Sequence, residues 1–489
     1  MVYNDIDRVL KRYSFEEKMK IAFENSTKLI EAYLDSTNNP NKFFKLVYPW
    51  ELETFVILSI KSKEWKNDIF STNKIFVNII NAIRNKNNMI LSVKTKNFST
   101  IEKIMIPLSA NQFDFQEDLF IRFYRFNYYF NFFNDEIDMR NEFFNKFKCK
   151  YDDFIFISFF LWMFFCCDLK NNYSSVNDVY KFLYMDYESA INCLTISREE
   201  YINEIDSITN DPNNYVICFK PSYKYPFVEY NKKIFLPLPH LLIRASTSSL
   251  MYRLTDGNQE LSEKIGKEIY ESYILKIISE SNMFDEVLPE QTYRNSKGEE
   301  LKTLDVLTRK DNNYFLFDSK SFSPKIDLRV LSDEAYQKDL LRIAQAYKQL
   351  YNHLRKYIDK ELSFFENKVV DKTNIFGIAI IREEPFFDKN HIYHKTAELL
   401  NIYIDSKEYK WLCKHVTHIS INILEKYCFC NINIVDSILE SYNDAEKNEL
   451  DLSYNYDHLD FTNNNFCAFK DSFCDNFKIK IKNFFENHT

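Results

Sequence analysis

The spacing of apolar and polar residues divides the chain into a helical first part and a mixed second part. Up to about residue 210, apolar residues recur at helical spacing, as in FEEKMKIAFENSTKLIEAYL at 15–34. Residues 211–256 differ, because YVICF and YPFVEYNKKIFLPLPHLL combine short β-prone runs with an Asn-Lys turn. We therefore expect a mainly helical domain over 1–210, followed by a β-rich connector that contains a hairpin.

From residue 257 the pattern alternates between helix and strand periods. An amphipathic helix is predicted over 260–281 and a second over 334–358. The predicted strands are 285–294, 301–309, 314–321, 374–381 and, as an additional strand, 415–423. This α-β-β-β-α-β order predicts a domain over 257–425 with a mixed central sheet and helices on its faces, followed by an extension over 426–489. The predicted fold class is a multidomain α+β or α/β protein.

The longest apolar run is FIFISFFLWMFFCC, residues 154–167, with acidic residues on both sides. It is shorter than the roughly 20 residues that a membrane-spanning helix needs, so we predict a buried core helix. The 10 cysteines in 489 residues do not form a disulfide framework, and the charged N-terminus is no signal peptide. A cytoplasmic protein without a membrane segment is expected.

The formal net charge of −8 means that any contact with nucleic acid must come from a local basic surface. One candidate is FIRFYRFNYYFNFF at 120–133, where Arg122 and Arg125 alternate with aromatic residues that can stack on bases. The favoured interpretation is a core helix with two surface arginines, because aromatic residues are enriched throughout the chain.

A polar turn in LKTLDVLTRKDNNYFLFDSKSF predicts the register of a hairpin. A symmetric loop at Lys-Asp-Asn-Asn pairs Arg309 with Tyr314, and the same register places Asp305 directly across from Asp318. Lys320 then shares a face with Asp318, because side chains alternate along a strand. The apolar neighbours divide accordingly, with Leu307 and Leu316 beside the charges and Val306, Thr308, Phe315 and Phe317 on the other face.

Charges in such an apolar strand are costly unless they bind something. Directly paired residues have Cβ atoms about 5 Å apart, so Asp305 and Asp318 repel each other and one of them would hold a proton. Mg²⁺ removes this conflict, since it binds one or two carboxylates together with water and phosphate. Lys320 can then orient or deprotonate a water molecule, or offset phosphate charge. The alternative is an exposed hairpin with a simple Asp318–Lys320 salt bridge, which leaves the shared register of the aspartates unexplained.

Asp305, followed after a short hairpin by Asp318-Ser319-Lys320, resembles the PD-(D/E)xK nuclease superfamily, which has the restriction-endonuclease-like fold. The resemblance covers about residues 257–425, and the N-terminal half is not recognised. It implies Mg²⁺-dependent phosphodiester hydrolysis, with Mn²⁺ as a substitute metal. Asp305, Asp318 and the main-chain carbonyl of Ser319 would bind the metal, and Lys320 would position the water. The superfamily's proline before the first aspartate is Leu304 here.

The superfamily often adds a glutamate from the first helix, for which Glu268 and Glu271 are the candidates. Glu271 borders Ile274 and Ile278 on the apolar stripe, whereas Glu268 lies further round, so we favour Glu271 as a catalytic and metal-binding residue. The alternative for either glutamate is an ordinary solvated charge.

The helix after the motif has a polar stripe opposite its apolar one. We interpret this stripe as an edge that faces phosphates, although an ordinary solvated face gives the same pattern. Gln345 is a possible auxiliary residue of the site, and the residues assigned to nucleic-acid binding are Lys338, Arg342 and Gln349.

A second cluster suggests zinc by composition alone, and its members are Cys413, His415, His418, Cys428 and Cys430. The spacing matches none of the usual zinc patterns, and cysteine often simply packs in a core. No Gly-rich phosphate loop occurs, so no NTPase activity is indicated.

These observations predict a metal-dependent nuclease whose N-terminal half recognises substrate or a protein partner. DNA is favoured over RNA because most of the superfamily cuts DNA. The domain combination resembles bacterial anti-phage defence and restriction effectors. The alternatives are a catalytically inactive nucleic-acid- or protein-binding scaffold and an RNA-targeting nuclease. An oligomer is compatible with the sequence.

Overall fold

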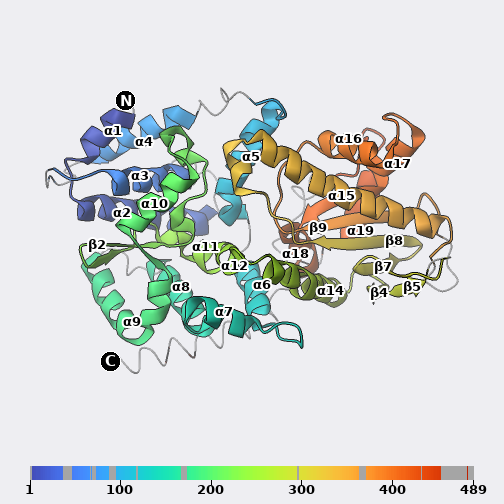
Figure 1. Ribbon diagram of the computed structural model, residues 1–489, viewed down its shortest axis with the longest axis horizontal. Coiled ribbons are helices and arrows are strands. Elements are labelled where there is room, and N and C mark those ends of the chain that lie inside the picture. Colours follow the sequence, from blue (N-terminus) through green and yellow to red (C-terminus); the bar gives the residue numbers. More distant parts are fainter. Residues whose placement is uncertain are drawn as a thin grey trace.

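Helices form nearly all of the N-terminal part of the chain. The computed structural model describes residues 3–36, 47–65, 68, 73–87, 95–116, 119–166, 173–294, 297–362, 370–430, 432–452, 479 and 482. Its first helices lie on the side of the molecule away from the sheet labelled β7–β9 (Figure 1). Their bounds are α1 Tyr3–Leu10, α2 Phe15–Ser36, α3 Pro49–Lys61, α4 Asn73–Asn87, α5 Thr100–Gln116, α6 Leu119–Asn131, α7 Met139–Phe147, α8 Tyr151–Cys166, α9 Tyr173–Cys193 and α10 Arg198–Ile208.

The connector over 211–256 contains the predicted hairpin and little other β-structure. β2 (Phe227–Tyr230) and β3 (Lys233–Phe235) pair across Asn231 and Lys232, whose positive φ angles suit a tight hairpin turn. A third strand, β1 (Thr195–Ser197), runs parallel to β2. YVICF was expected to be β-prone, but it begins in a 3₁₀ turn (Pro212–Val216), and α11 (Leu242–Ser246) and α12 (Ser248–Thr255) end the connector. β-rich is therefore too strong a description of this segment.

A five-stranded mixed sheet forms the centre of the C-terminal part, with strand order β10-β9-β8-β7-β4. Its strands are β4 Glu286–Pro289, β7 Val306–Lys310, β8 Asn313–Lys320, β9 Ile375–Ile381 and β10 Val416–Ser420. β4, β7 and β8 pair antiparallel, whereas β8, β9 and β10 pair parallel. The predicted mixed sheet is therefore confirmed.

Helices cover both faces of this sheet (Figure 1). On one face lie α15 (Asp333–Ile358), α16 (Lys389–Leu400) and α17 (Lys407–His415), which share a core with Leu307, Leu316 and Ala379. On the other face lie α14 (Glu271–Glu280), α18 (Ile421–Phe429) and α19 (Ile434–Asn443), around Phe315, Phe317 and Ile378. The predicted division of the hairpin side chains between two faces is confirmed.

Two of the predicted strands are each broken into two pieces. The segment 285–294 forms β4 and, after a break, β5 (Thr292–Arg294), and the segment 301–309 forms β6 (Glu300–Lys302) and β7. β5 and β6 pair in a small sheet of their own. The break in the first segment falls at Glu290-Gln291 and the break in the second at Thr303–Asp305, so both lie beside the acidic end of the motif hairpin β7–β8.

One hydrophobic core joins the N-terminal helices to the sheet. Buried residues of α6 and α8, such as Phe130 and Phe154, belong to the same cluster as Tyr273 and Phe317. The apolar run 154–167 is thus a buried helix over its described part, as predicted, and no described helix is long and apolar enough to cross a membrane. The expected boundary near residue 210 is therefore crossed by continuous packing.

The two arginines of α6 are not at the surface, contrary to the prediction. Arg122 and Arg125 are only 1% and 3% exposed, and Arg125 pairs with Glu425 of α18 at 3.3 Å. Tyr273 of α14 donates a 2.6 Å hydrogen bond to the same Glu425. Most of the described aromatic residues around them are buried or partly buried, so Arg122 and Arg125 are charges of the core and do not face solvent.

A buried ion pair holds the N-terminal helices to the connector. Glu53 of α3 lies 3.0 Å from Lys220, and Tyr223 donates a 2.8 Å hydrogen bond to it. Burial raises the pKa of Glu53, but the attraction of Lys220, helped by His240 and Tyr223, outweighs this effect and lowers it to about 2. The carboxylate is therefore charged within the core.

Replacing Lys220 with Met should destabilise the protein strongly, because it leaves the Glu53 charge buried without its cation. Breaking one partner of a buried pair costs about 3–5 kcal/mol. The control is Lys233→Met, which removes an exposed pair with Glu16 and should cost less than about 1 kcal/mol. Urea unfolding measures both, and equal losses would contradict a buried, charged Glu53.

Candidate active site

The motif charges lie at the carboxyl end of β8, the middle strand of the sheet. Asp318 pairs with Ala379 of β9, and Lys320 pairs with Ile381 at the end of that strand. The hairpin register is the predicted one, with Arg309 opposite Tyr314 and Val306 opposite Phe317. Carboxyl ends of parallel strands are a common position for ligand sites in such sheets.

Asp305 interacts with β8 through its side chain and not as a further backbone pair. The ladder ends at Val306 opposite Phe317, and Asp305 lies in a bend just before β7. Its Oδ2 accepts a 2.6 Å hydrogen bond from the Ser319 amide and another from the Ser319 hydroxyl. The predicted direct pairing with Asp318 is thus replaced by a side-chain cap on the next residue of the strand.

Asp318 is almost completely buried beside Lys320. Its exposed fraction is 2%, and Lys320 Nζ lies 2.7 Å from its Oδ2, whereas the Lys320 side chain is 31% exposed. No described group donates a hydrogen bond of good geometry to that oxygen. The carboxylate therefore depends on one partly solvated cation, which offsets little of the cost of burying a charge.

The first helix has a π-helical turn directly before Glu271. α13 (Gln259–Lys264) passes through Ile265–Tyr270, a π-turn, into α14. Such turns are frequently found at functional sites. Gly266 in this turn lies against the segment after Lys320, since a Cβ there would come within 2.8 Å of Ser321 Oγ. The turn thus brings the helix close to the end of β8.

The two helical glutamates have different surroundings. Glu271 lines a cavity of about 460 Å³ with Ser319 and Lys320, which we name the β8 cavity. Glu268 accepts a 3.0 Å hydrogen bond from Asn134 and pairs with Lys267 at 3.1 Å, and it does not line this cavity. Of the two, Glu271 is the one placed with the motif residues.

The polar stripe of α15 reaches the β8 cavity only in part. Arg342, Gln345 and Gln349 line it, and the Arg342 guanidinium also lies 4.7 Å from the centre of the Phe322 ring. Lys338 is not in the lining, and it pairs with Glu334 on the same helix. Lys338 is thus separated from the other three residues.

Three charged or titratable residues near the site were missed from the sequence. Glu290, just after β4, raises the pKa of Asp305 and of Asp318 by repulsion, and Lys302 pairs with it. His353 of α15 is kept neutral, because burial and the nearby Lys356 and Lys320 lower its pKa to about 4. Glu290 lies inside the predicted strand 285–294, so nothing in the sequence marks it as a residue that follows a strand. Nothing local distinguishes His353 from other helix residues.

Uncompensated negative charge dominates the electrostatics of the site. Burial, then repulsion by Asp305 and Glu290, raises the pKa of Glu271 to about 8. Burial raises the pKa of Asp318 to about 7, although the attraction of Lys320 lowers it. Burial also raises the pKa of Asp305, although the hydrogen bonds from Ser319 lower it. We call these four acids, Glu271, Glu290, Asp305 and Asp318, the carboxylate cluster.

The carboxylate cluster has the donor chemistry that Mg²⁺ or Mn²⁺ prefers, namely oxygen ligands with excess negative charge. Among the described residues no three acidic, histidine or cysteine side chains converge tightly enough to enclose an ion by themselves. Mg²⁺ itself usually takes one or two protein carboxylates and completes its shell with water and phosphate. Ser319 engages Oδ2 of Asp305, and Asp318 Oδ2 is buried without a hydrogen bond of good geometry, so both carboxylates have an oxygen that fits that role.

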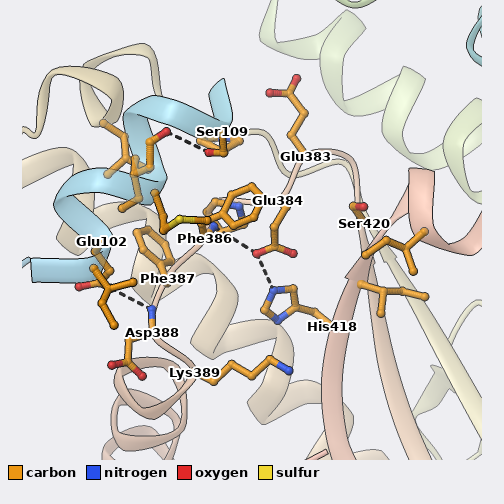
Figure 2. A pocket seen from close by; sticks show the side chains of 18 of the residues that line it. Glu102, Ser109, Glu383, Glu384, Phe386, Phe387, Asp388, Lys389, His418 and Ser420 are labelled. Atoms are coloured by element: carbon orange, nitrogen blue, oxygen red, sulfur yellow. Dashed lines mark hydrogen bonds and ion pairs between the residues drawn. The ribbon is translucent and has the colours of Figure 1, made fainter. Parts of the chain in front are cut away.

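A larger cavity, of about 770 Å³, lies between α5, the loop after β9 and the junction of β10 with α18 (Figure 2). Its acidic groups are already engaged by the protein. Glu102 accepts hydrogen bonds from Tyr336 and from the Asp388 amide, and Glu384 lies 3.1 Å from His418 Nε2. We therefore place the candidate active site at the β8 cavity, despite its smaller volume.

The cysteine and histidine residues considered for zinc serve other purposes. His415 bonds to the Ile375 carbonyl at 2.7 Å and stacks on Phe376, and His418 bonds to Tyr347 and Glu384. Cys413, Cys428 and Cys430 are buried in the core. The part of the chain that the structure describes contains no group of these residues arranged to hold a metal.

The raised carboxyl pKa values predict the pH dependence of stability in EDTA. A folded-state pKa of about 7 for Asp318 lies above the unfolded value of about 3.9, so the folded state holds more protons between these pH values. Stability should therefore fall as the pH rises from about 4 to about 7. Asp318→Asn should flatten this fall in urea unfolding, and the exposed control Asp285→Asn should keep it. An unchanged slope in Asp318→Asn would contradict a buried, destabilised carboxylate.

Comparison with known proteins assigns no family and no function to the chain. No protein-family model, curated protein or solved structure matches the chain. The nuclease resemblance therefore stays a prediction from the motif and the order of elements. The site itself consists of a buried aspartate–lysine pair, a capping aspartate and a helical glutamate. Glu271, Ser319 and Lys320 line the β8 cavity, whereas Asp305 and Asp318 are not part of this lining.

Proposed function

We propose that this protein is a metal-dependent nuclease of the PD-(D/E)xK type. The observation that carries the proposal is the shared location of Asp305, Asp318 and Lys320 at the end of the central strand. Their charges are poorly compensated there, although burying them is costly. A bound cation would supply the positive charge that these carboxylates lack, and a phosphodiester would be the substrate that binds with it.

Each residue has a role that follows from its surroundings. Asp318 and Asp305 would hold Mg²⁺, with Mn²⁺ as a substitute, together with the Ser319 carbonyl, and Glu271 would join them from the helix. The bound cation would polarise the phosphate and lower the pKa of a water molecule. Lys320 has a partly exposed ammonium group beside Asp318, which suits it to orient that water or to neutralise charge on the phosphate. The Ser319 hydrogen bonds fix the orientation of Asp305.

The β8 cavity provides the approach for the substrate backbone. Arg342 contributes a cation, and Gln345 and Gln349 contribute amide donors. DNA is proposed over RNA from the family resemblance, as is a role in bacterial anti-phage defence. A cytoplasmic setting is proposed from the cysteine content. The N-terminal helices would bind substrate or a protein partner. Because α6 and α8 share a core with α14, binding at these helices can reach the catalytic helix through direct packing.

The main alternative is a scaffold that keeps the fold and binds nucleic acid or protein without cutting. In that case the carboxylate cluster would reduce stability without a compensating activity. RNA cleavage by the same site is the other alternative. A panel of substrates distinguishes all three possibilities.

Lys320→Ala and Asp318→Ala should each reduce cleavage by at least about 100-fold, the lower end of the effect of a lost acid–base or electrostatic group. The assay uses linear, circular and single-stranded DNA and RNA, each in Mg²⁺, Mn²⁺ and EDTA. The control is Lys310→Ala, a lysine at the opposite end of the same hairpin that pairs with Asp285, and it should cut normally. No cleavage of any substrate, or cleavage that survives both substitutions, would overturn the nuclease proposal.

Arg342→Ala should weaken substrate binding at every sequence tested and reduce the salt dependence of binding, because one phosphate contact is lost. Lys338→Ala should have a smaller effect, since Lys338 lies outside the β8 cavity and pairs with Glu334. Binding measured in EDTA over a range of salt concentrations compares the two. Equal effects would contradict substrate approach through this cavity.

A further inference from the structure

Glu290 lies next to the motif in the sheet, although it is 15 residues before Asp305 in the sequence. Pro289, the last residue of β4, pairs with Val306, the first residue of β7. Glu290 follows Pro289 and Asp305 precedes Val306, so both acids come directly after the last pair of the β4–β7 ladder. Asp305 in turn bonds to Ser319 of β8. Glu290 after β4, Asp305 before β7 and Asp318 near the end of β8 therefore lie at the same end of the sheet.

A lysine on the adjacent small sheet holds Glu290 at this end. Lys302, the last residue of β6, forms an ion pair with the Glu290 carboxylate, whose side chain is 33% exposed. The charge of Glu290 nevertheless acts on the site, because it raises the pKa of Glu271, Asp305 and Asp318. Lys302 thus leaves part of the repulsion uncompensated.

We propose that Glu290 is a fourth carboxylate of the proposed cation site and strengthens cation binding there, either as a ligand or through a bound water. The inference rests on the proposed metal site but does not require that the site cuts nucleic acid. A carboxylate that repels its neighbours in the cation-free protein attracts a cation placed among them. It therefore destabilises the free protein and stabilises the loaded one.

A purely structural Glu290 predicts the opposite. If its only role were the pair with Lys302, its loss would weaken the cation-free protein and leave cation affinity unchanged. The two roles predict opposite changes in the stability of the cation-free protein, and only the proposed role predicts a change in cation affinity. Glu290→Gln separates them, since Gln has nearly the same shape and lacks only the charge.

The test uses the full chain, stripped with EDTA, and the metal alone. Titration calorimetry with Mn²⁺ measures the dissociation constant, and thermal melting is followed with and without Mg²⁺. The control variant is Glu286→Gln at the opposite end of β4, whose carboxylate pairs with Arg309. Circular dichroism verifies that each variant is folded.

We expect Glu290→Gln to raise the Mn²⁺ dissociation constant about 10-fold, the lower end of the effect of residues that support a metal site. Its metal-free melting temperature should rise, its stabilisation by Mg²⁺ should shrink, and Glu286→Gln should bind Mn²⁺ as the wild type does. A dissociation constant within about threefold of the wild-type value, or a wild type that binds no Mn²⁺, overturns the inference. Wild-type protein that binds Mn²⁺ with the help of Glu290 but cuts no substrate overturns the nuclease proposal alone.

Discussion

The structure of the site depends on like charges that the fold forces together. β7 and β8 pair in a register that brings Asp305 and Asp318 to the same end of the hairpin, and β8 is the middle strand of the sheet. The backbone cannot separate these acids without shifting the register, which would move every apolar side chain of the hairpin to the wrong face. The repulsion is therefore built into the same pairing that forms the core.

The surrounding elements place further acidic residues at this end of the sheet and provide few cations to neutralise them. The π-turn before α14 brings Glu271 to the β8 cavity, and the end of β4 brings Glu290 beside Asp305. The cations nearest to these acids, Lys320 and Lys302, are both partly exposed and thus partly screened by solvent. By contrast, Glu53 and Glu425 in the cores each have a buried cation at about salt-bridge distance. The structural acids are thus paired with buried cations, whereas the cations beside the carboxylate cluster are partly solvated.

Sequence patterns predicted those features that local rules determine. The turn chemistry of Lys310–Asn313 and the alternation along β8 were enough for the register and for the faces of Leu316 and Phe317. The division of 285–294 and 301–309 was missed, because it depends on which strand each piece pairs with. Glu290 was missed for the same reason, and the burial of Arg125 was missed because its partner Glu425 lies 300 residues away.

The most direct test of the central claim is to locate the cation. Crystals grown with Mn²⁺ should show an anomalous scattering peak at the carboxyl end of β8, in contact with Asp318 and Asp305 and beside Lys320. The peak should disappear in Asp318→Asn crystals. A Mn²⁺ peak elsewhere in the molecule, or none at saturating Mn²⁺, would contradict a metal-dependent site built on these residues.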